Sequence, residues 1–244
     1  MKATIVILIL LIAQSFTTNQ SDSSSKYKIQ KLKKPPTIDA VWDKMPWRKI
    51  EPITIDNYMG DKPEHIPFTQ AKMAYDNSAI YIIFRVEDQY IKAVNKKNQG
   101  PICRDSCVEF FFSPGENSKN GYLNIEMNCG GVMLFNFQKT PISEKILLSE
   151  TDLQQITVAH TLPRIIENEI TEKTTWSIEY RIPFSMLKKY MSFSTPKANT
   201  IWRANFYKCA DRTSHPHWLT WAPVDNERPN FHLPEYFGVL EFQK

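Results

Sequence analysis

Glycine is scarce in this chain of 244 residues, which has 7 glycines against 16 prolines. The glycines are too scattered to form GxGxxG, GxxxxGKS or GxxxxGKT, so the sequence excludes the glycine-rich loops that hold nucleotide phosphates. Proline is accompanied by 6 Trp, 10 Tyr and 14 Phe, a combination that favours short strands and rigid loops over long helices. With 42% hydrophobic and 23% charged residues, the composition is that of a chain that buries a core.

The chain also lacks a hydrophobic run long enough to cross a membrane. Lys2 precedes an apolar stretch over Ile5–Ala13, and about nine apolar residues are too few for a bilayer core of roughly 30 Å. A positive residue before such a stretch is typical of a signal peptide, which we predict over residues 1–15. A polar linker over 16–34 and one domain over 35–244 are expected to follow. The protein is therefore expected to be secreted or periplasmic, without stable membrane insertion.

A large excess of charge is missing as well. The formal net charge is +4, and the basic residues gather only at Lys31, Lys33 and Lys34. Nucleic acids and anionic membranes are bound through dense basic patches. The sequence therefore gives no indication of a nucleic-acid partner.

Cysteine is limited to Cys103, Cys107, Cys129 and Cys209. Export permits disulfides, and four cysteines allow three pairings. A bond between Cys103 and Cys107 is the least expected, because an extended segment would place their Cα atoms roughly 13 Å apart. Buried free thiols are an equal alternative. CxxC and HExxH spacings do not occur, so no metal site is predicted.

What the chain does contain is many short segments in which apolar and polar residues alternate. These are Ala71–Tyr75, Ile80–Val86, Cys107–Phe112, Tyr122–Asn128, Trp176–Ile182, Ile201–Cys209 and Phe237–Phe242. The first two flank the turn residues 76–78 and predict a hairpin. One short helix is expected over Pro183–Met191, and no internal repeat is visible. The pattern predicts an all-β fold, an antiparallel β-sandwich of the immunoglobulin or jelly-roll kind.

Two glutamates stand on the polar faces of successive strands. Val108, Phe110 and Phe112 are expected to point inward, which turns Glu109 to the opposite face, and Glu126 lies on the polar face of the next strand. Glycoside hydrolases use two facing carboxyl groups, so this pair is a candidate. The commoner alternative is a solvated strand face. Neither GxSxG nor a Cys/His signature is present, and the pair His215 and His217 is assigned to turn packing rather than to a metal.

The aromatic residues near the C-terminus suggest a sugar site. The segment Trp218–His232 combines aromatic rings with Asn, Glu and Arg side chains. Sugar rings stack their C–H faces on aromatic planes, while their hydroxyls need oriented polar partners. Trp218 and Trp221 should face opposite sides by alternation, so one of them is expected in the core.

The succession of motifs resembles carbohydrate-binding module family 9 and its exported bacterial relatives. The segment Asp105–Phe111 resembles the family's D-S-V-E-I-F motif, and Thr37–Trp47 resembles its IDG…W start. The other matching segments are Ala71–Asp88, Tyr122–Asn128, Trp176–Pro183, Asn205–Cys209 and Phe231–Gly238. The likeness covers about residues 36–243 in the family's order and implies an antiparallel β-sandwich.

This resemblance also implies where a ligand would bind. Family members hold sugar between two aromatic side chains; the first position falls at Cys103 or Ile102 and the second at Phe231. The resemblance implies polar contacts from Glu109, Asn128, Arg228 and Asn230. Neither residue at the first position is aromatic, and the candidate replacements for the missing ring are Trp218, Tyr90 and Tyr207. Some family members bind a structural calcium ion, for which the candidate ligands are Asp76, Asp88 and Asp105.

The resemblance and the residues together predict an exported, non-catalytic carbohydrate-binding protein. It would take part in polysaccharide recognition or catabolism, with a poly- or oligosaccharide as ligand and glycan-degrading enzymes as possible partners. One alternative is a glycoside hydrolase, or an accessory component of one, that uses Glu109 and Glu126. Another is a haem-binding sandwich of the DOMON type, which needs an axial His or Met pair facing a pocket.

Overall fold

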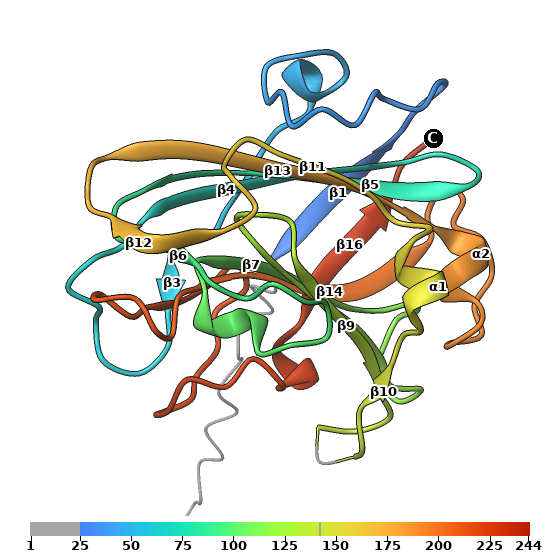
Figure 1. The fold of residues 1–244 in the computed structure, drawn as a ribbon. Coiled ribbons are helices and arrows are strands. Elements are labelled where there is room, and N and C mark those ends of the chain that lie inside the picture. Colours follow the sequence, from blue (N-terminus) through green and yellow to red (C-terminus); the bar gives the residue numbers. More distant parts are fainter. Residues whose placement is uncertain (1–24, 142) are drawn as a thin grey trace, which may run out of the picture.

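The computed structural model describes residues 25–141 and 143–244, which form two β-sheets packed face to face (Figure 1). This confirms the predicted β-sandwich. The predicted signal peptide over 1–15 lies outside the described residues and stays a prediction. Within the described part of the chain, no helix is long and apolar enough to cross a membrane.

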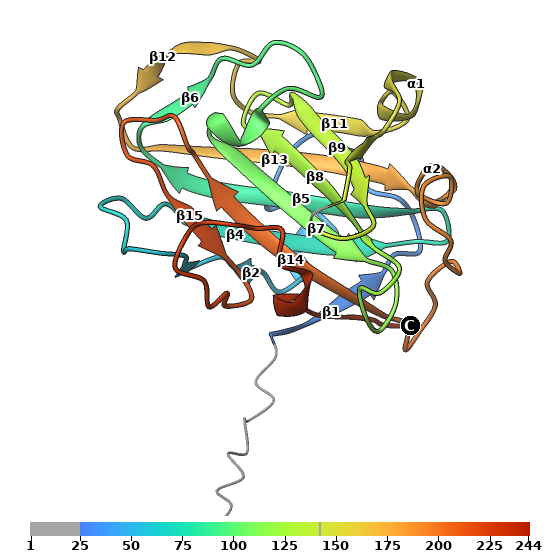
Figure 2. The ribbon, with the colours of Figure 1, turned by 90° about the horizontal axis from the view of Figure 1, so that it is seen from below.

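The first sheet is formed by strands from the middle of the chain and by its last strands, with one short strand from the N-terminal part. In order across the sheet its strands are β10 (Ile146–Leu147), β9 (Met133–Gln138), β8 (Tyr122–Asn128), β7 (Cys107–Ser113), β14 (Ile201–Cys209) and β16 (Gly238–Phe242). β15 (Trp218–Thr220) pairs with β14, and β3 (Asn57–Tyr58) pairs with β15. The second sheet contains β2 (Ile53–Thr54), β4 (Phe68–Tyr75), β5 (Ala79–Asp88), β13 (Thr174–Pro183) and β11 (Thr157–His160). Figure 2 shows β7, β8 and β14 crossing β4, β5 and β13.

One strand joins the two sheets along an edge. β1 (Lys26–Lys31) pairs in parallel with β16 through its first four residues and in parallel with β4 through Gln30 and Lys31. These two pairings are the parallel ones among the described strands, and the others are antiparallel. The structure differs here from the expected linker over 16–34, because Tyr27 and Ile29 alternate with polar residues and their side chains are buried.

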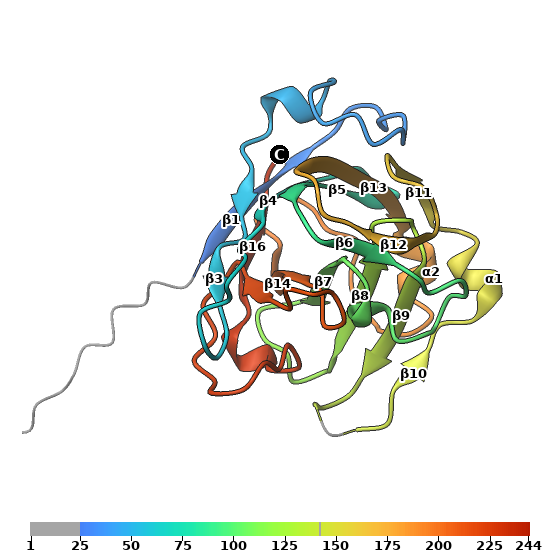
Figure 3. The same ribbon diagram turned by 60° about the vertical axis from the view of Figure 1, so that its left-hand side comes forward.

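Helices are few and short, as the sequence predicts. α2 (Phe184–Leu187) begins after Pro183, within the span expected to be helical. α1 (Glu150–Leu153) was not predicted, and neither were the 3-10 turns η1 (Trp47–Lys49), η2 (Ile102–Arg104) and η3 (Pro234–Tyr236). β6 (Ile91–Ala93) and β12 (Ile166–Ile170) pair separately at one end of the sandwich, which Figure 3 shows from the side.

The core between the sheets follows the predicted alternation. Val108, Phe110 and Phe112 of β7 all belong to it, as the sequence analysis expects. The ring of Phe110 stacks on Phe206 of β14 with centroids 4.8 Å apart, and Phe206 lies 6.0 Å from Phe84 of the opposite sheet. Aromatic contacts of this kind fix how the two sheets sit on each other.

The outward faces of both sheets are covered as well. Residues 36–52 lie over the second sheet, where Lys72 Nζ donates to the carbonyl of Trp47. The loop over 221–237 lies over the first sheet and packs Phe231 and Phe237 against Phe111 and Tyr122. A solvated outer face for Glu109 and Glu126 is therefore wrong: their exposed fractions are 1% and 6%.

Candidate functional site

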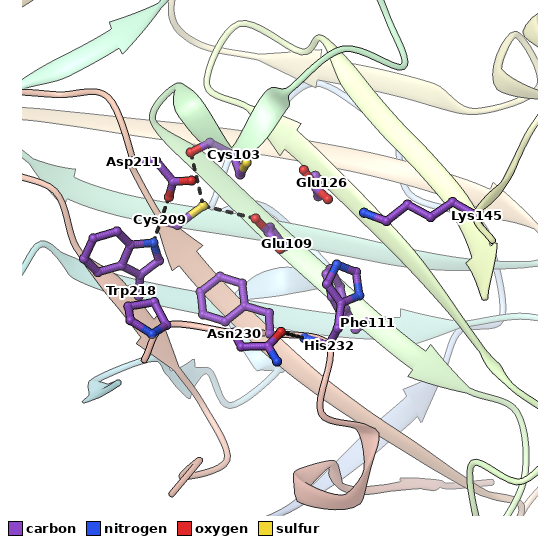
Figure 4. A pocket seen from close by; sticks show the side chains of 12 residues that line it. Cys103, Glu109, Phe111, Glu126, Lys145, Cys209, Asp211, Trp218, Asn230 and His232 are labelled. Carbon is purple, nitrogen blue, oxygen red and sulfur yellow. Dashed lines mark hydrogen bonds between the residues drawn. The ribbon is translucent and has the colours of Figure 1, made fainter. Parts of the chain in front are cut away.

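A pocket of about 210 Å³ lies between the outward face of the first sheet and the C-terminal loop (Figure 4). Strands β7, β8 and β14 form its floor, and the loop before η3 forms its wall. Its lining residues are Cys103, Glu109, Phe111, Glu126, Lys145, Cys209, Asp211, Trp218, Pro229, Asn230, Phe231 and His232. The pocket places carboxyl groups opposite aromatic rings, the combination expected for a sugar site.

The two glutamates on the floor are direct neighbours across two strands. Glu109 of β7 and Glu126 of β8 are register partners in the antiparallel pair. Such partners have Cβ atoms about 4.5–5.5 Å apart. Figure 4 shows both side chains between Trp218 on one side and Lys145 on the other.

Burial dominates the electrostatics of this floor. It raises the pKa of Glu109 well above its usual range, and the charge of Glu126 raises it further. Burial also raises the pKa of Glu126, to about 7, although Lys145 acts in the opposite direction. The pKa of Asp211 is raised by burial too. Burial therefore favours the protonated form of both glutamates.

Two thiols adjoin the carboxyl group of Glu109. Cys107 and Cys209 are register partners of β7 and β14. The Sγ atoms of Cys209 and Cys107 lie 3.0 Å and 3.9 Å from Glu109 Oε1. All four cysteines are free thiols, which is one of the two predicted alternatives. Cys107, Glu109 and Cys209 lie close enough together to share one metal ion. Within the described part of the chain, this is the one such group of His, Cys, Asp or Glu side chains. Sequence spacing did not reveal this group.

The wall of the pocket is aromatic and held in place by hydrogen bonds. Trp218 Nε1 donates to Asp211 Oδ1 over 2.8 Å. The ring of Phe231 stacks on Tyr207 with centroids 4.1 Å apart and an interplanar angle of 16°. His232 Nδ1 lies 2.9 Å from the hydroxyl of Tyr122, and burial lowers the pKa of His232 to about 4. One face of Phe231 is therefore taken by the core.

Four of the six predicted ligand-binding residues meet in this pocket: Glu109, Phe231, Asn230 and Trp218. Asn128 does not. Its amide Nδ2 donates to Asp105 Oδ2, and its Oδ1 accepts from the backbone N–H groups of Gly130 and Val132, so it holds the turn after β8. Arg228 is exposed and does not line the pocket.

The missing first aromatic position is now located. Cys103 lines the pocket where the resemblance places a ring, while Ile102 is fully buried. Tyr90 does not replace the ring, because it stacks on His215, and Tyr207 lies behind Phe231. Of the three candidate replacements, Trp218 is the one that lines the pocket together with Phe231. Trp221 packs against the main core, which confirms that the two tryptophans separate.

Several lining residues were missed by sequence reasoning. Cys209 ends a segment that was expected to be a strand, and Asp211 lies in a stretch without a prediction. His232 belongs to the segment in which a sugar site was expected, but it was not singled out as a ligand-binding residue. Lys145 comes from the exposed segment just before β10. The sole sequence signal for Cys209 is the alternation of β14, which places it on the same face as Tyr207.

The candidate calcium ligands are not brought together. Asp76 accepts from the N–H groups of Ser78 and Ala79 in the hairpin turn. Asp105 accepts from the N–H groups of Val94 and Asn95. Asp88 lies 2.8 Å from His65 and forms an ion pair with the buried Lys208 at 3.4 Å. Each carboxylate has its own local partners, so the three do not form one site.

The remaining candidates also have structural partners. His217 Nε2 accepts from Lys208 Nζ over 2.7 Å and its Nδ1 lies 3.0 Å from the carbonyl of His215, which leaves no free ring nitrogen for a metal shared with His215. The haem alternative needs an axial His or Met pair. Among the described residues that line the pocket, His232 is the one histidine and methionine is absent.

A β-sandwich with carboxyl groups and aromatic rings in one pocket is compatible with a carbohydrate-binding module. The sequence model of Carbohydrate-binding family 9 matches residues 39–242, and the chain belongs to that family. No curated protein matches the chain.

Solved structures agree with this assignment. A protein from Bacteroides uniformis, proposed to bind carbohydrate, is 27% identical with a TM-score of 0.81 over 91% of this chain and 100% of its own. A family 9 module from Caldicellulosiruptor kristjanssonii in complex with cellotriose is 14% identical with a TM-score of 0.62 over 90% and 94%. A family 9 module from the same organism in complex with glucose is 16% identical with a TM-score of 0.56 over 90% and 96%. The last two share the fold.

Proposed function

We propose that this protein is an exported, non-catalytic module that binds a poly- or oligosaccharide in the pocket over β7, β8 and β14. The observation that carries the proposal is the meeting of Trp218 and Phe231 with Glu109, Glu126 and Asp211 in one pocket. Aromatic platforms and a few fixed polar groups are the two requirements for holding a sugar ring.

Trp218 is the residue best placed to stack on a sugar. Its ring is partly exposed, and the hydrogen bond to Asp211 fixes its orientation, so little entropy is lost on binding. Glu126 and Asn230 supply oxygen acceptors and an amide donor for sugar hydroxyls. Phe231, with an exposed fraction of 9%, contributes an edge rather than an open face.

Similar structures support an oligosaccharide ligand. The two family 9 modules from Caldicellulosiruptor kristjanssonii are complexes with cellotriose and with glucose. A glucose unit or the end of a β-glucan chain is accordingly the first ligand to test here. The proposed export rests on the predicted signal peptide. The proposed role in polysaccharide catabolism beside glycan-degrading enzymes rests on the family's carbohydrate-binding character. N-terminal sequencing of the mature protein tests the signal peptide.

Calorimetric titration with glucose, cellobiose and cellotriose tests the binding proposal. We expect binding that weakens at least about tenfold in Trp218→Ala, because the stacking platform is lost. The matched control is Phe68→Ala, since Phe68 is an aromatic residue of β4, 49% exposed and far from the lining. Absence of binding to these and to arrayed glycans at millimolar concentration, or equal losses in both variants, contradicts the proposal.

The facing glutamates support a second candidate, a glycoside hydrolase. Retaining enzymes place their two carboxyl groups about 5–5.5 Å apart, which register partners on adjacent strands can achieve. Glu126, with a pKa of about 7, would be the general acid. Release of reducing sugar that is lost in Glu126→Gln while binding persists would establish this function. Its absence from the wild-type protein excludes it.

A further inference from the structure

The carboxyl group of Glu109 and the thiols of Cys107 and Cys209 form a compact group on three adjacent positions of two strands. Glu109 Oε1 and the two Sγ atoms all lie within 4.8 Å of one another. The three side chains point to the same face because β7 residues 107 and 109 are two apart, and Cys209 stands directly opposite Cys107 on β14. A rigid sheet thus holds all three.

We propose that Cys107, Cys209 and Glu109 together bind one thiophilic divalent cation of the zinc class at the floor of the pocket. The inference goes beyond the proposed function and does not depend on it.

The spacing fits a tetrahedral ion. Zinc–sulfur bonds of about 2.3 Å and zinc–oxygen bonds of about 2.0–2.2 Å place sulfur and oxygen ligands about 3.6 Å apart. The observed separations from Glu109 Oε1 are 3.0 Å to Cys209 Sγ and 3.9 Å to Cys107 Sγ, so a shift of about half an ångström suffices. Three protein ligands leave a fourth position for water or a ligand.

The surroundings favour a cation. Glu126 and Asp211 line the same pocket, and the positive side chain that lines it within the described residues is Lys145, which is exposed. Glu109 and Glu126 are buried, and acidic groups buried away from water are costly unless a cation compensates them. Cys209 and Glu109 both line the pocket, so an ion has a path from solvent, while Cys107 is fully buried behind them.

The donor set selects the metal. Two thiol ligands suit zinc, cobalt and cadmium, whereas calcium and magnesium require oxygen ligands. Binding passes the two thiol protons and the proton of Glu109 to the buffer, and the oxidation states of metal and sulfur do not change.

Cobalt titration of the reduced protein under anaerobic conditions tests the proposal. We expect one Co²⁺ per chain, with the near-ultraviolet charge-transfer band of thiolate ligation, and its displacement by Zn²⁺ but not by Ca²⁺. Cys209→Ala and Cys107→Ala should each lose the band and bind at least about 100-fold more weakly, since loss of groups that only support a ligand already costs about 10–100-fold.

Cys129→Ala is the matched control, because Cys129 is also a fully buried thiol but lies outside the group. It should keep the band. Glu109→Gln, which preserves side-chain volume, should retain the fold and weaken binding, so the test survives if a cysteine variant fails to fold. Absence of the band, its persistence in both Cys107→Ala and Cys209→Ala, or a Cys107–Cys209 disulfide in the protein purified without reductant would each overturn the proposal.

Discussion

Glu179 and Glu109 are both buried glutamates in the middle of a long strand, one on the outward face of each sheet, and their surroundings differ in kind. Glu179 accepts hydrogen bonds from the N–H groups of Asp39 and Ala40, from Trp47 Nε1 and from Lys44 Nζ, all within 3.0 Å. Glu109 has thiol neighbours and a second glutamate beside it, and it lines a pocket.

This difference separates a structural acid from a functional one. Four donors compensate the buried charge of Glu179 and tie residues 36–52 to the second sheet. Glu109 has no such set of donors among the described residues, and burial disfavours its charged form at a place that a ligand can reach. A strongly raised pKa in a pocket is typical of a functional site.

The largest effect is expected at the structural acid. Glu179→Ala should lower the free energy of unfolding by about 3–5 kcal/mol, because it leaves Trp47 Nε1 and two backbone N–H groups without their acceptor and removes one of the acceptors of Lys44. Urea unfolding measures this. The control is Glu87→Ala, whose carboxylate is exposed and paired with Arg85, and which should change stability by no more than about 0.5 kcal/mol. A loss below about 1 kcal/mol for Glu179→Ala would contradict the structural role.

The pH dependence of stability reports on the pocket. A carboxyl group whose pKa is raised in the folded state binds more protons there than in the unfolded chain, so stability falls as pH rises between the two values. For Glu126 this window runs from 4.5 to about 7. Deprotonation of Glu126 across that range should lower the free energy of unfolding by up to about 3 kcal/mol.

The Glu126→Gln variant should flatten this fall, measured as urea midpoints from pH 4 to pH 8 with a chelator present. Glu167→Gln, at an exposed position paired with Lys96, should retain the wild-type profile. A wild-type protein whose stability rises through this window would show that the pocket carboxyls are ionised and compensated.

The same substitution of glutamate by glutamine, made separately at Glu109 and at Glu179, gives the sharpest contrast between the two acids. Glu109→Gln should leave stability at pH 7 within about 1 kcal/mol of wild type, because a neutral amide replaces an acid whose charged form is disfavoured by burial. Glu179→Gln should cost at least about 2 kcal/mol, because both carboxylate oxygens accept hydrogen bonds and the NH₂ group that replaces one of them must face a donor. Equal costs, measured with a chelator present, would remove the distinction between the two acids.

The smallest effect is expected at the exposed lysine of the pocket. Lys145 lowers the pKa values of both Glu109 and Glu126, so Lys145→Met should move the pH midpoint of the stability profile upward. Salt should abolish this shift, because exposed charges are screened. A midpoint that moves downward would show that the lysine does not act on the two acids.

The strands and their inward faces could be predicted from the sequence because alternation is a local property. The hairpin of β4 and β5 and the inward side of β7 are examples. β1 carried the same signal in Tyr27 and Ile29, but its polar neighbours concealed it. The covering of both outward faces depends on loops far away in the chain, so no local pattern revealed it.

The candidate site could be predicted from the sequence only in part. Glu109, Trp218 and Phe231 belong to segments that the family resemblance marks. The approach of Cys107 to Cys209 depends on the pairing of two strands about 100 residues apart, as the contact of Cys209 with Glu109 shows. Asn128 was wrongly expected in the pocket because alternation gives a side chain its face but not its hydrogen-bonding partners.

The strand β1 protects two sheet edges at the same time. Its backbone covers β16 along one half and β4 along the other. Unpaired strand edges are templates for association with other chains. Lifting this single six-residue strand would therefore uncover both layers of the sandwich to self-association, although it would remove no residue of the pocket.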